Sequence, residues 1–168
     1  LLFDALARLK VNGPLYFQLV EGRDLIADVL PPPNYIIETY LTAYELRDSI
    51  GDPVNVERLA GAISRLESEY AVRHVYWAKE NAFFEGNPSI RAAMVEKSYV
   101  PAMEFYRILR ESYIPAVRSG EREVVDGLLA GSLKDSYDEH RKWIDEVVTG
   151  ARRANASLEL RAASSERA

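Results

Sequence analysis

Three consecutive prolines, Pro31, Pro32 and Pro33, constrain the fold more strongly than any other feature, because the sequence on both sides is compatible with helix. A proline has no backbone N–H and its ring clashes with the preceding turn, so three in succession cannot lie inside an α-helix. The residue before a proline is also driven toward extended backbone. We therefore expect one helix to stop before these prolines and another to restart with Asn34 as its N-cap. The interruption is either a plain corner or, because it leaves backbone groups free beside Tyr35, part of a small ligand site.

The rest of the chain has the apolar spacing of long helices joined by short turns. Turns are predicted at Gly51-Asp52-Pro53, at Gly86-Asn87-Pro88 and at Ser119-Gly120. Pro101 and Pro115 are expected to kink the helix that contains them or to remove a hydrogen bond from it. No sustained two-residue alternation predicts a strand. The predicted helices span residues 1–28, 34–49, 54–84, 89–118 and 121–160.

These predicted lengths and connections indicate a fold class. A helix of about 30 residues is about 45 Å long, and short connections place consecutive helices antiparallel. We predict a single all-α domain over residues 1–168. Its expected architecture is an elongated up-and-down four-helix bundle whose first helix is broken at Pro31–Pro33.

Composition excludes several classes of function. The net charge is −5, whereas a nucleic-acid partner requires a basic stripe. Cysteine is absent, which excludes disulfides, Cys-ligated metals and a Cys nucleophile. A di-iron bundle needs Glu three residues before its histidines, but Ala71 precedes His74 and Tyr137 precedes His140. Haem bound between the two histidines is disfavoured, because only two histidines exist and each has a simpler interpretation than haem ligation. With no nucleophile-elbow motif and no phosphate-binding loop, we predict no enzyme activity, no metal and no cofactor.

A count of residues along the helices predicts a polar layer at the height of the proline break. The break lies about 19 residues before the turn at residues 51–53, and the same rise along the next helix reaches position 72. Equal counts on either side of the turn at residues 119–120 reach positions 101 and 139. At this height the apolar stripes give way to Tyr, His, Trp and Arg. The candidate ligand-binding residues are Tyr35, Arg73, His74, Trp77, Tyr99, Tyr137 and His140.

The helical period leaves open whether Arg73 or His74 points inward. A buried cation requires a partner, and a small carboxylate ligand would supply one. Free N–H groups at the restart of the helix near Asn34 would add affinity for an anion. Simpler interpretations stay open too. His140 can be a core residue with satisfied hydrogen bonds, the tyrosines can be packing residues, and Arg73 can reach solvent or pair with Glu69 or Glu80 on its own helix.

Several segments resemble the extracytoplasmic sensor domain of bacterial methyl-accepting chemotaxis proteins. They are Lys10–Tyr16, Asp24–Leu30, Pro31–Glu38 and the later Tyr137–Arg141. The resemblance implies a helical-bundle domain between two transmembrane helices of an inner-membrane receptor, facing the periplasm. It also implies a homodimer, a small ligand, and a signal passed to a cytoplasmic methyl-accepting module that controls a kinase.

From the residues and the resemblance together, we expect a ligand-binding sensor domain of a transmembrane chemoreceptor. We expect it to bind a short carboxylate and to signal by a small helix shift. The chain begins with Leu rather than Met, so we expect it to be a fragment of a membrane-anchored protein. The alternative is a structural or protein-binding helical module without a small-molecule ligand.

Overall fold

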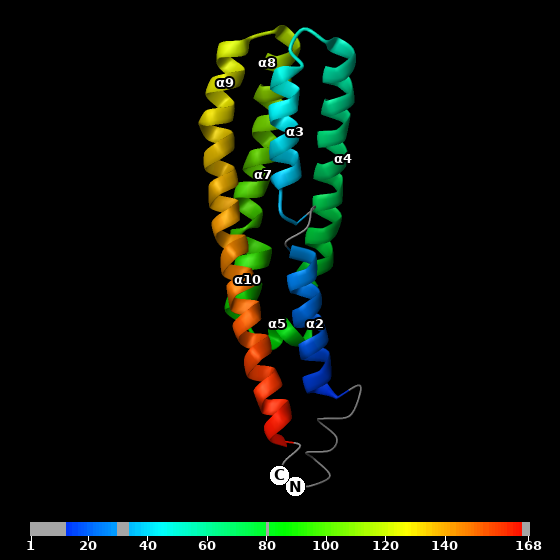
Figure 1. Ribbon diagram of the computed structural model, residues 1–168, viewed down its shortest axis with the longest axis vertical. Helices are drawn as coiled ribbons and strands as arrows, with labels where there is room; N and C mark the ends of the chain where they lie inside the picture. The colour runs from blue at the N-terminus through cyan, green and yellow to red at the C-terminus, as the bar shows by residue number, and fades with distance from the viewer. Residues whose placement is uncertain (1–12, 30–33, 80, 166–168) are drawn as a thin grey trace.

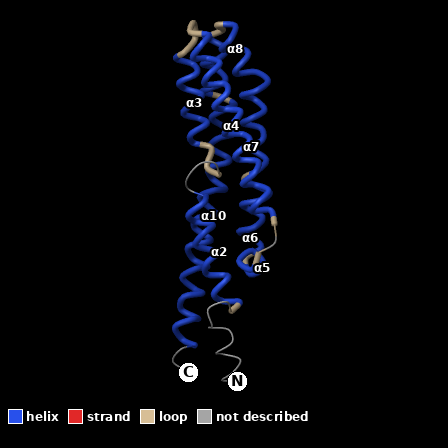
Figure 2. The backbone as a smooth tube through the Cα atoms, turned by 90° about the vertical axis from the view of Figure 1, so that its right-hand side faces the viewer, coloured by secondary structure: helices blue, strands red, loops and turns tan. Residues whose placement is uncertain are grey.

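The computed structural model describes residues 13–29, 34–79 and 81–165, and these residues form helices and no strand. The molecule is elongated, with its helices along the long axis and with the start of α2 and the end of α10 at the same end (Figure 1). The tube view shows the same helical rods from the side (Figure 2). The prediction of an all-α chain is therefore confirmed for the described residues.

The first rod is interrupted where the prolines predict it. Helix α2 (Pro14–Val29) ends before them and α3 (Ile37–Asp48) begins after them. Pro31, Pro32 and Pro33 themselves lie outside the described residues.

The prediction that Asn34 caps the restarted helix is wrong. The N-cap of α3 is Ile36, which makes no side-chain capping bond. Asn34 instead donates from Nδ2 to the carbonyl of Asp28, over 3.0 Å. The last carbonyls of a helix lack intrahelical donors, and the Asn34 amide supplies one for α2. Asn34 therefore caps the helix before the break instead of the one after it.

The long helix α4 (Pro53–Ala78) begins one residue before its predicted start and ends early. Asp52 accepts a hydrogen bond on Oδ1 from the N–H of Asn55, at 3.1 Å, and Pro53 takes the first helical position. The predicted end at residue 84 is wrong, because Lys79 is extended. Asn81 then starts a new helix, α5 (Ala82–Gly86), by accepting from the N–H of Phe84 at 2.8 Å. An asparagine inside an apparent helical pattern competes for backbone donors and here restarts the helix.

The predicted helix 89–118 is a nearly continuous rod that changes its hydrogen-bonding pattern twice. A π-helical segment precedes each of its two prolines, Pro101 and Pro115. In the first, the N–H of Ser98 bonds to the carbonyl of Ala93, five residues earlier, at 2.9 Å. The rod consists of α6 (Pro88–Arg91), η1 (Ala92–Lys97), α7 (Tyr99–Ile108), η2 (Leu109–Tyr113) and α8 (Ile114–Ser119).

The predicted final helix, 121–160, is two helices. Helix α9 (Arg122–Ala130) is separated from α10 (Ser132–Ser165) by Gly131, whose φ of −104° and ψ of −107° are not helical. Glycine tolerates such a conformation because it has no Cβ. The apolar face continues across the interruption, since Leu129 and Leu133 are both buried.

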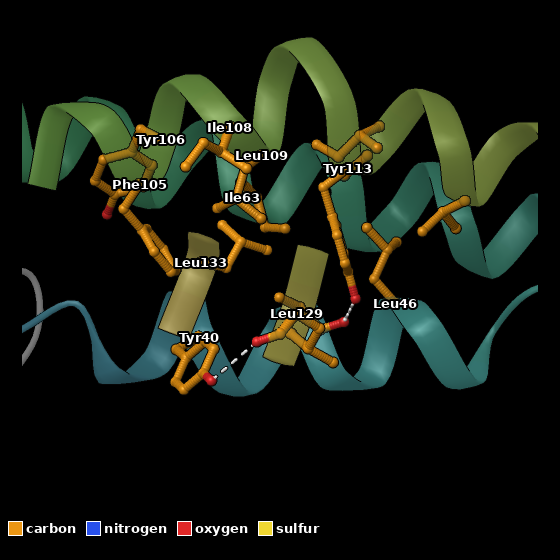
Figure 3. Packing of buried hydrophobic residues seen from close by; sticks show 14 of the residues in the cluster. Tyr40, Leu46, Ile63, Phe105, Tyr106, Ile108, Leu109, Tyr113, Leu129 and Leu133 are labelled. Atoms are coloured by element: carbon orange, nitrogen blue, oxygen red, sulfur yellow. Dashed lines mark hydrogen bonds between the residues drawn. The ribbon is translucent and has the colours of Figure 1, made fainter. Parts of the chain in front are cut away.

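The core is divided into two apolar clusters, one above the break and one below it. The upper core contains Tyr40, Phe105, Tyr113 and Leu129 among others, and Figure 3 shows part of it. The lower core packs α2, α5 and α10 together through residues that include Leu25, Phe83, Phe84, Ile144 and Val147. Tyr35 packs against both clusters.

Candidate functional site

A layer of buried polar groups separates the two cores at the break in the first rod. On α10, Tyr137 belongs to the upper core and Ile144 to the lower, and the buried His140 lies between them. Ser98 is 1% exposed and Asn34 2% exposed, so both are as buried as the apolar core. Polar groups are costly to bury unless they are hydrogen-bonded. We call this region the break layer. It consists of Asp28, Asn34, Tyr35, Tyr70, Arg73, His74, Trp77, Ser98, Tyr99, Tyr137 and His140.

His140 joins three parts of the chain. Its ring is fully buried, with Nδ1 2.8 Å from the carbonyl oxygen of Ser98 and Nε2 3.1 Å from that of Asn34. Burial lowers the pKa of His140, while the two carbonyls act in the opposite direction. These contacts fit the simpler interpretation of a core histidine whose ring nitrogens face protein groups.

Tyr35 and Tyr137 meet through their hydroxyl groups, which lie 2.6 Å apart. The ring of Tyr137 also stacks on Tyr40, with centroids 4.6 Å apart. Burial, and then the bond with Tyr35, raises the pKa of the Tyr137 phenol above its ordinary value. The Tyr137 hydroxyl therefore stays protonated near neutral pH and can donate as well as accept.

Arg73 and Trp77 converge on Asp28, in the last turn of α2. A terminal nitrogen of Arg73 lies 3.2 Å from Asp28 Oδ1, and the indole N–H of Trp77 donates to Oδ2 over 3.3 Å. The Arg73 side chain is 41% exposed, so solvent reaches this pair. Arg73 was expected to reach solvent or to pair with Glu69 or Glu80 on its own helix. It pairs instead with Asp28 of α2, and Glu80 lies outside the described residues.

His74 turns the other way, toward the π-helical segment. Its Nε2 lies 2.9 Å from the carbonyl oxygen of Val95, and its ring stacks on Tyr99 with centroids 3.8 Å apart. Tyr70, one turn earlier, stands 6.3 Å from Tyr99 and 6.1 Å from His140 by ring centroids. Arg73 and His74 thus flank the interior on opposite sides, both partly buried, while Tyr70 and Trp77 take the inward positions.

The seven candidate residues therefore fall into three neighbouring groups around the break. Tyr35 meets Tyr137, Arg73 meets Trp77 through Asp28, and His74 and Tyr99 are linked to His140 through Tyr70. Assignment of these residues to ligand binding stays a prediction. Their donors, an arginine, an indole and phenol hydroxyls, are suited to an anion with a carboxylate group.

Three contributions to the break layer were not predicted from the sequence. They are the carboxylate of Asp28 and the backbone carbonyls of Asn34 and Ser98. A signal for Asp28 was present. A negative charge in the last turn of a helix opposes the macrodipole, so it calls for a cation nearby. No comparable signal marks Ser98, whose role depends on its backbone carbonyl.

Comparison with protein-family models, with curated proteins and with solved structures finds no match. Within the described ranges, no group of three or more His, Asp or Glu side chains is placed to hold a metal ion. None of the described helices has both the length and the apolar character needed to cross a bilayer.

Proposed function

We propose that this domain is the extracytoplasmic sensor domain of a bacterial methyl-accepting chemotaxis receptor and binds a short carboxylate in the break layer. In this proposal α2 with α3, α4, the rod from α6 to α8, and α9 with α10 are the four legs of an up-and-down bundle. The domain faces the periplasm, is anchored to the inner membrane through the rest of its receptor, and works as a homodimer.

The observation that carries the proposal is the polar layer itself. A helical rod built only for rigidity gains most from a continuous apolar core, because buried polar groups contribute little net stability. Here the core is divided in two, and the division coincides with the break in the first rod. Ligand sites in helical bundles are formed by side chains of facing helices in this way.

Asp28 indicates how a carboxylate would bind. Its two oxygens already accept from Arg73 and Trp77, so these two donors are spaced for one carboxylate group. A ligand carboxylate would take this position and displace Asp28. The hydroxyls of Tyr35 and Tyr137 lie near the same break and would contact the rest of the ligand.

Displacement of Asp28 would reach the rest of the domain through the end of α2. The carbonyl of Asp28 is the group that Asn34 caps, and the carbonyl of Asn34 faces His140 on α10. A change at Asp28 would therefore bias the position of α10, by a shift of about 1–2 Å as in other helix-shift transitions. Such a bias requires the ligand to bind the two arrangements with different affinity.

The experiment is a thermal melt of the domain with acetate, propionate, pyruvate, lactate and succinate, followed by calorimetry on any that raise the melting temperature. Arg73→Gln should weaken binding roughly tenfold to a hundredfold, since a hydrogen bond to a charged group contributes about 1.5–3 kcal/mol. Arg65→Gln is the matched control, two turns earlier on α4 and exposed. It should bind like the parent.

Asp28→Asn should change carboxylate affinity in the opposite direction to Arg73→Gln. It removes the internal competitor for Arg73 and should tighten carboxylate binding while slightly lowering stability. If Asp28→Asn and Arg73→Gln both bind a carboxylate like the parent, the ligand position is wrong. If none of the carboxylates raises the melting temperature, the alternative of a structural or protein-binding helical module is favoured.

A further inference from the structure

His140 presents two ring nitrogens to two hydrogen-bond acceptors. Nδ1 faces the carbonyl of Ser98, at the junction of η1 and α7, and Nε2 faces the carbonyl of Asn34, in the break between α2 and α3. A backbone carbonyl only accepts. Both contacts are hydrogen bonds only if both ring nitrogens carry a proton.

Both carbonyls need a donor because the helices around them are irregular. The bond that Ser98 receives from the N–H of Ala102 is long, at 3.4 Å, against a usual value of about 2.9–3.0 Å. Asn34 lies before the N-cap of α3, so its carbonyl is outside the regular helix. Both residues are almost fully buried, and a buried backbone carbonyl without a partner is costly.

A neutral imidazole carries one proton and can satisfy one of these carbonyls, whereas an imidazolium satisfies both. We propose that His140 is a proton-operated clasp on the break. With one proton, on Nδ1, it bonds the Ser98 carbonyl and leaves that of Asn34 without a donor among the described residues. A second proton, taken from solvent onto Nε2, adds the bond to Asn34 and ties the break to α7 and α10.

The surroundings of the ring support the neutral form near neutral pH. Burial is the largest influence on His140 and lowers its pKa from the usual value. From α4 the ring meets Tyr70, whose own pKa is raised by burial, so it stays neutral. From α7 and from the break it meets carbonyls, and its charged helix neighbours Glu139 and Arg141 are exposed. In the proposal the single proton lies on Nδ1, which makes the shorter of the two contacts, to Ser98.

The clasp concerns contacts within the domain alone and is independent of the proposed ligand. It predicts that acidification tightens the break against local openings that leave His140 buried, because only the imidazolium bonds the Asn34 carbonyl. It also predicts that acid lowers global stability, because the unfolded chain binds the proton more strongly than the folded one. This loss would begin as the pH falls below the ordinary histidine value of about 6.5 and continue toward the lower pKa of the folded state.

The test is a long-range ¹H–¹⁵N correlation spectrum of the ¹⁵N-labelled domain, which distinguishes the two neutral tautomers and the imidazolium. The titration runs from about pH 8 to about pH 5, the range in which histidine acts as a switch. The two histidines are assigned with a His74→Gln variant. His140 should be the Nδ1–H tautomer at the upper end and become imidazolium on acidification. An Nε2–H tautomer, or an imidazolium that persists at the upper end, would overturn the proposal.

Hydrogen exchange supplies the second readout. In the parent, protection of the amides around Ile36, corrected for intrinsic exchange, should rise severalfold on acidification. His140→Asn places an amide donor near the Nδ1 position and has no second proton to take up. Its protection should stay flat with pH. Equal pH dependence in parent and variant would refute the clasp, and if the variant fails to fold, the titration of the parent still decides.

Discussion

Gly22 offers a sharp test of how α2 packs on α10. A Cβ at this position would lie 2.2 Å from Oδ1 of Asn155 and 2.7 Å and 2.8 Å from two ring carbons of Phe83. These distances are far inside van der Waals contact, and Phe83 is fully buried. Gly22→Ala must therefore displace a core ring and a buried amide.

The size of the effect follows from two opposing terms. Alanine in place of glycine inside a helix gains about 0.5–1 kcal/mol, and overpacking a closed core costs about 1–3 kcal/mol. We expect a net loss of about 1–2 kcal/mol. In a domain of this size that corresponds to a fall in melting temperature of about 2–8 °C, at about 2–4 °C per kcal/mol.

Gly61→Ala is the matched control on α4. A Cβ at Gly61 meets nothing within 4 Å, so only the helix-propensity gain remains and the melting temperature should rise. The double variant Gly22→Ala/Asn155→Ala should recover part of the loss, since it removes the closest clash and a buried oxygen that has no hydrogen-bond partner within the described part of the chain. If Gly22→Ala raises the melting temperature as much as Gly61→Ala, the close approach of α2 and α10 is refuted.

Three further changes test other contacts. Tyr113→Phe removes the buried hydroxyl that donates to the Ala43 carbonyl at 2.7 Å (Figure 3), and urea unfolding should show a loss of about 1 kcal/mol. Asn81→Ala removes the N-cap of α5 and should cost about 1 kcal/mol by the same assay; an unchanged midpoint in either variant would contradict its assigned bond. Tyr35→Phe breaks the hydroxyl pair with Tyr137, so the Tyr137 phenol should titrate at lower pH in an ultraviolet absorbance titration, because that bond raises its pKa.

The height of the break layer was predictable from the sequence, whereas the pairing within it was not. The rise per residue of a helix is nearly constant, so counting from each turn places Tyr35, His74, Tyr99 and His140 at one level. Which side a residue faces depends on the helix rotation, and a shift of one position changes it by about 100°. Arg73 and His74 are adjacent in sequence, so the count could not show that Arg73 contacts α2 and His74 contacts α7.

Helix ends were predicted well where a cap and a proline coincide and poorly where a single residue decides. The turn predicted at Gly51-Asp52-Pro53 places the start of α4 within one residue of its observed start at Pro53. Asn81 and Gly131 interrupt segments whose apolar periodicity continues, so periodicity carried the predicted helices through them. The apolar pattern reports which face is buried, and it is insensitive to a one-residue break in the backbone.

The position of His140 follows from the two irregular helices that face it. The break after α2 and the π-helical segment before Pro101 lie at the same height, and each presents a buried carbonyl that its own helix serves poorly. A hydroxyl or a single N–H on α10 could satisfy only one of them. Histidine carries nitrogens on two sides of one small ring and so reaches both. Two helix interruptions at equal height, facing a lone histidine on the opposite helix, are therefore a sequence pattern that predicts a histidine bonded to backbone carbonyls.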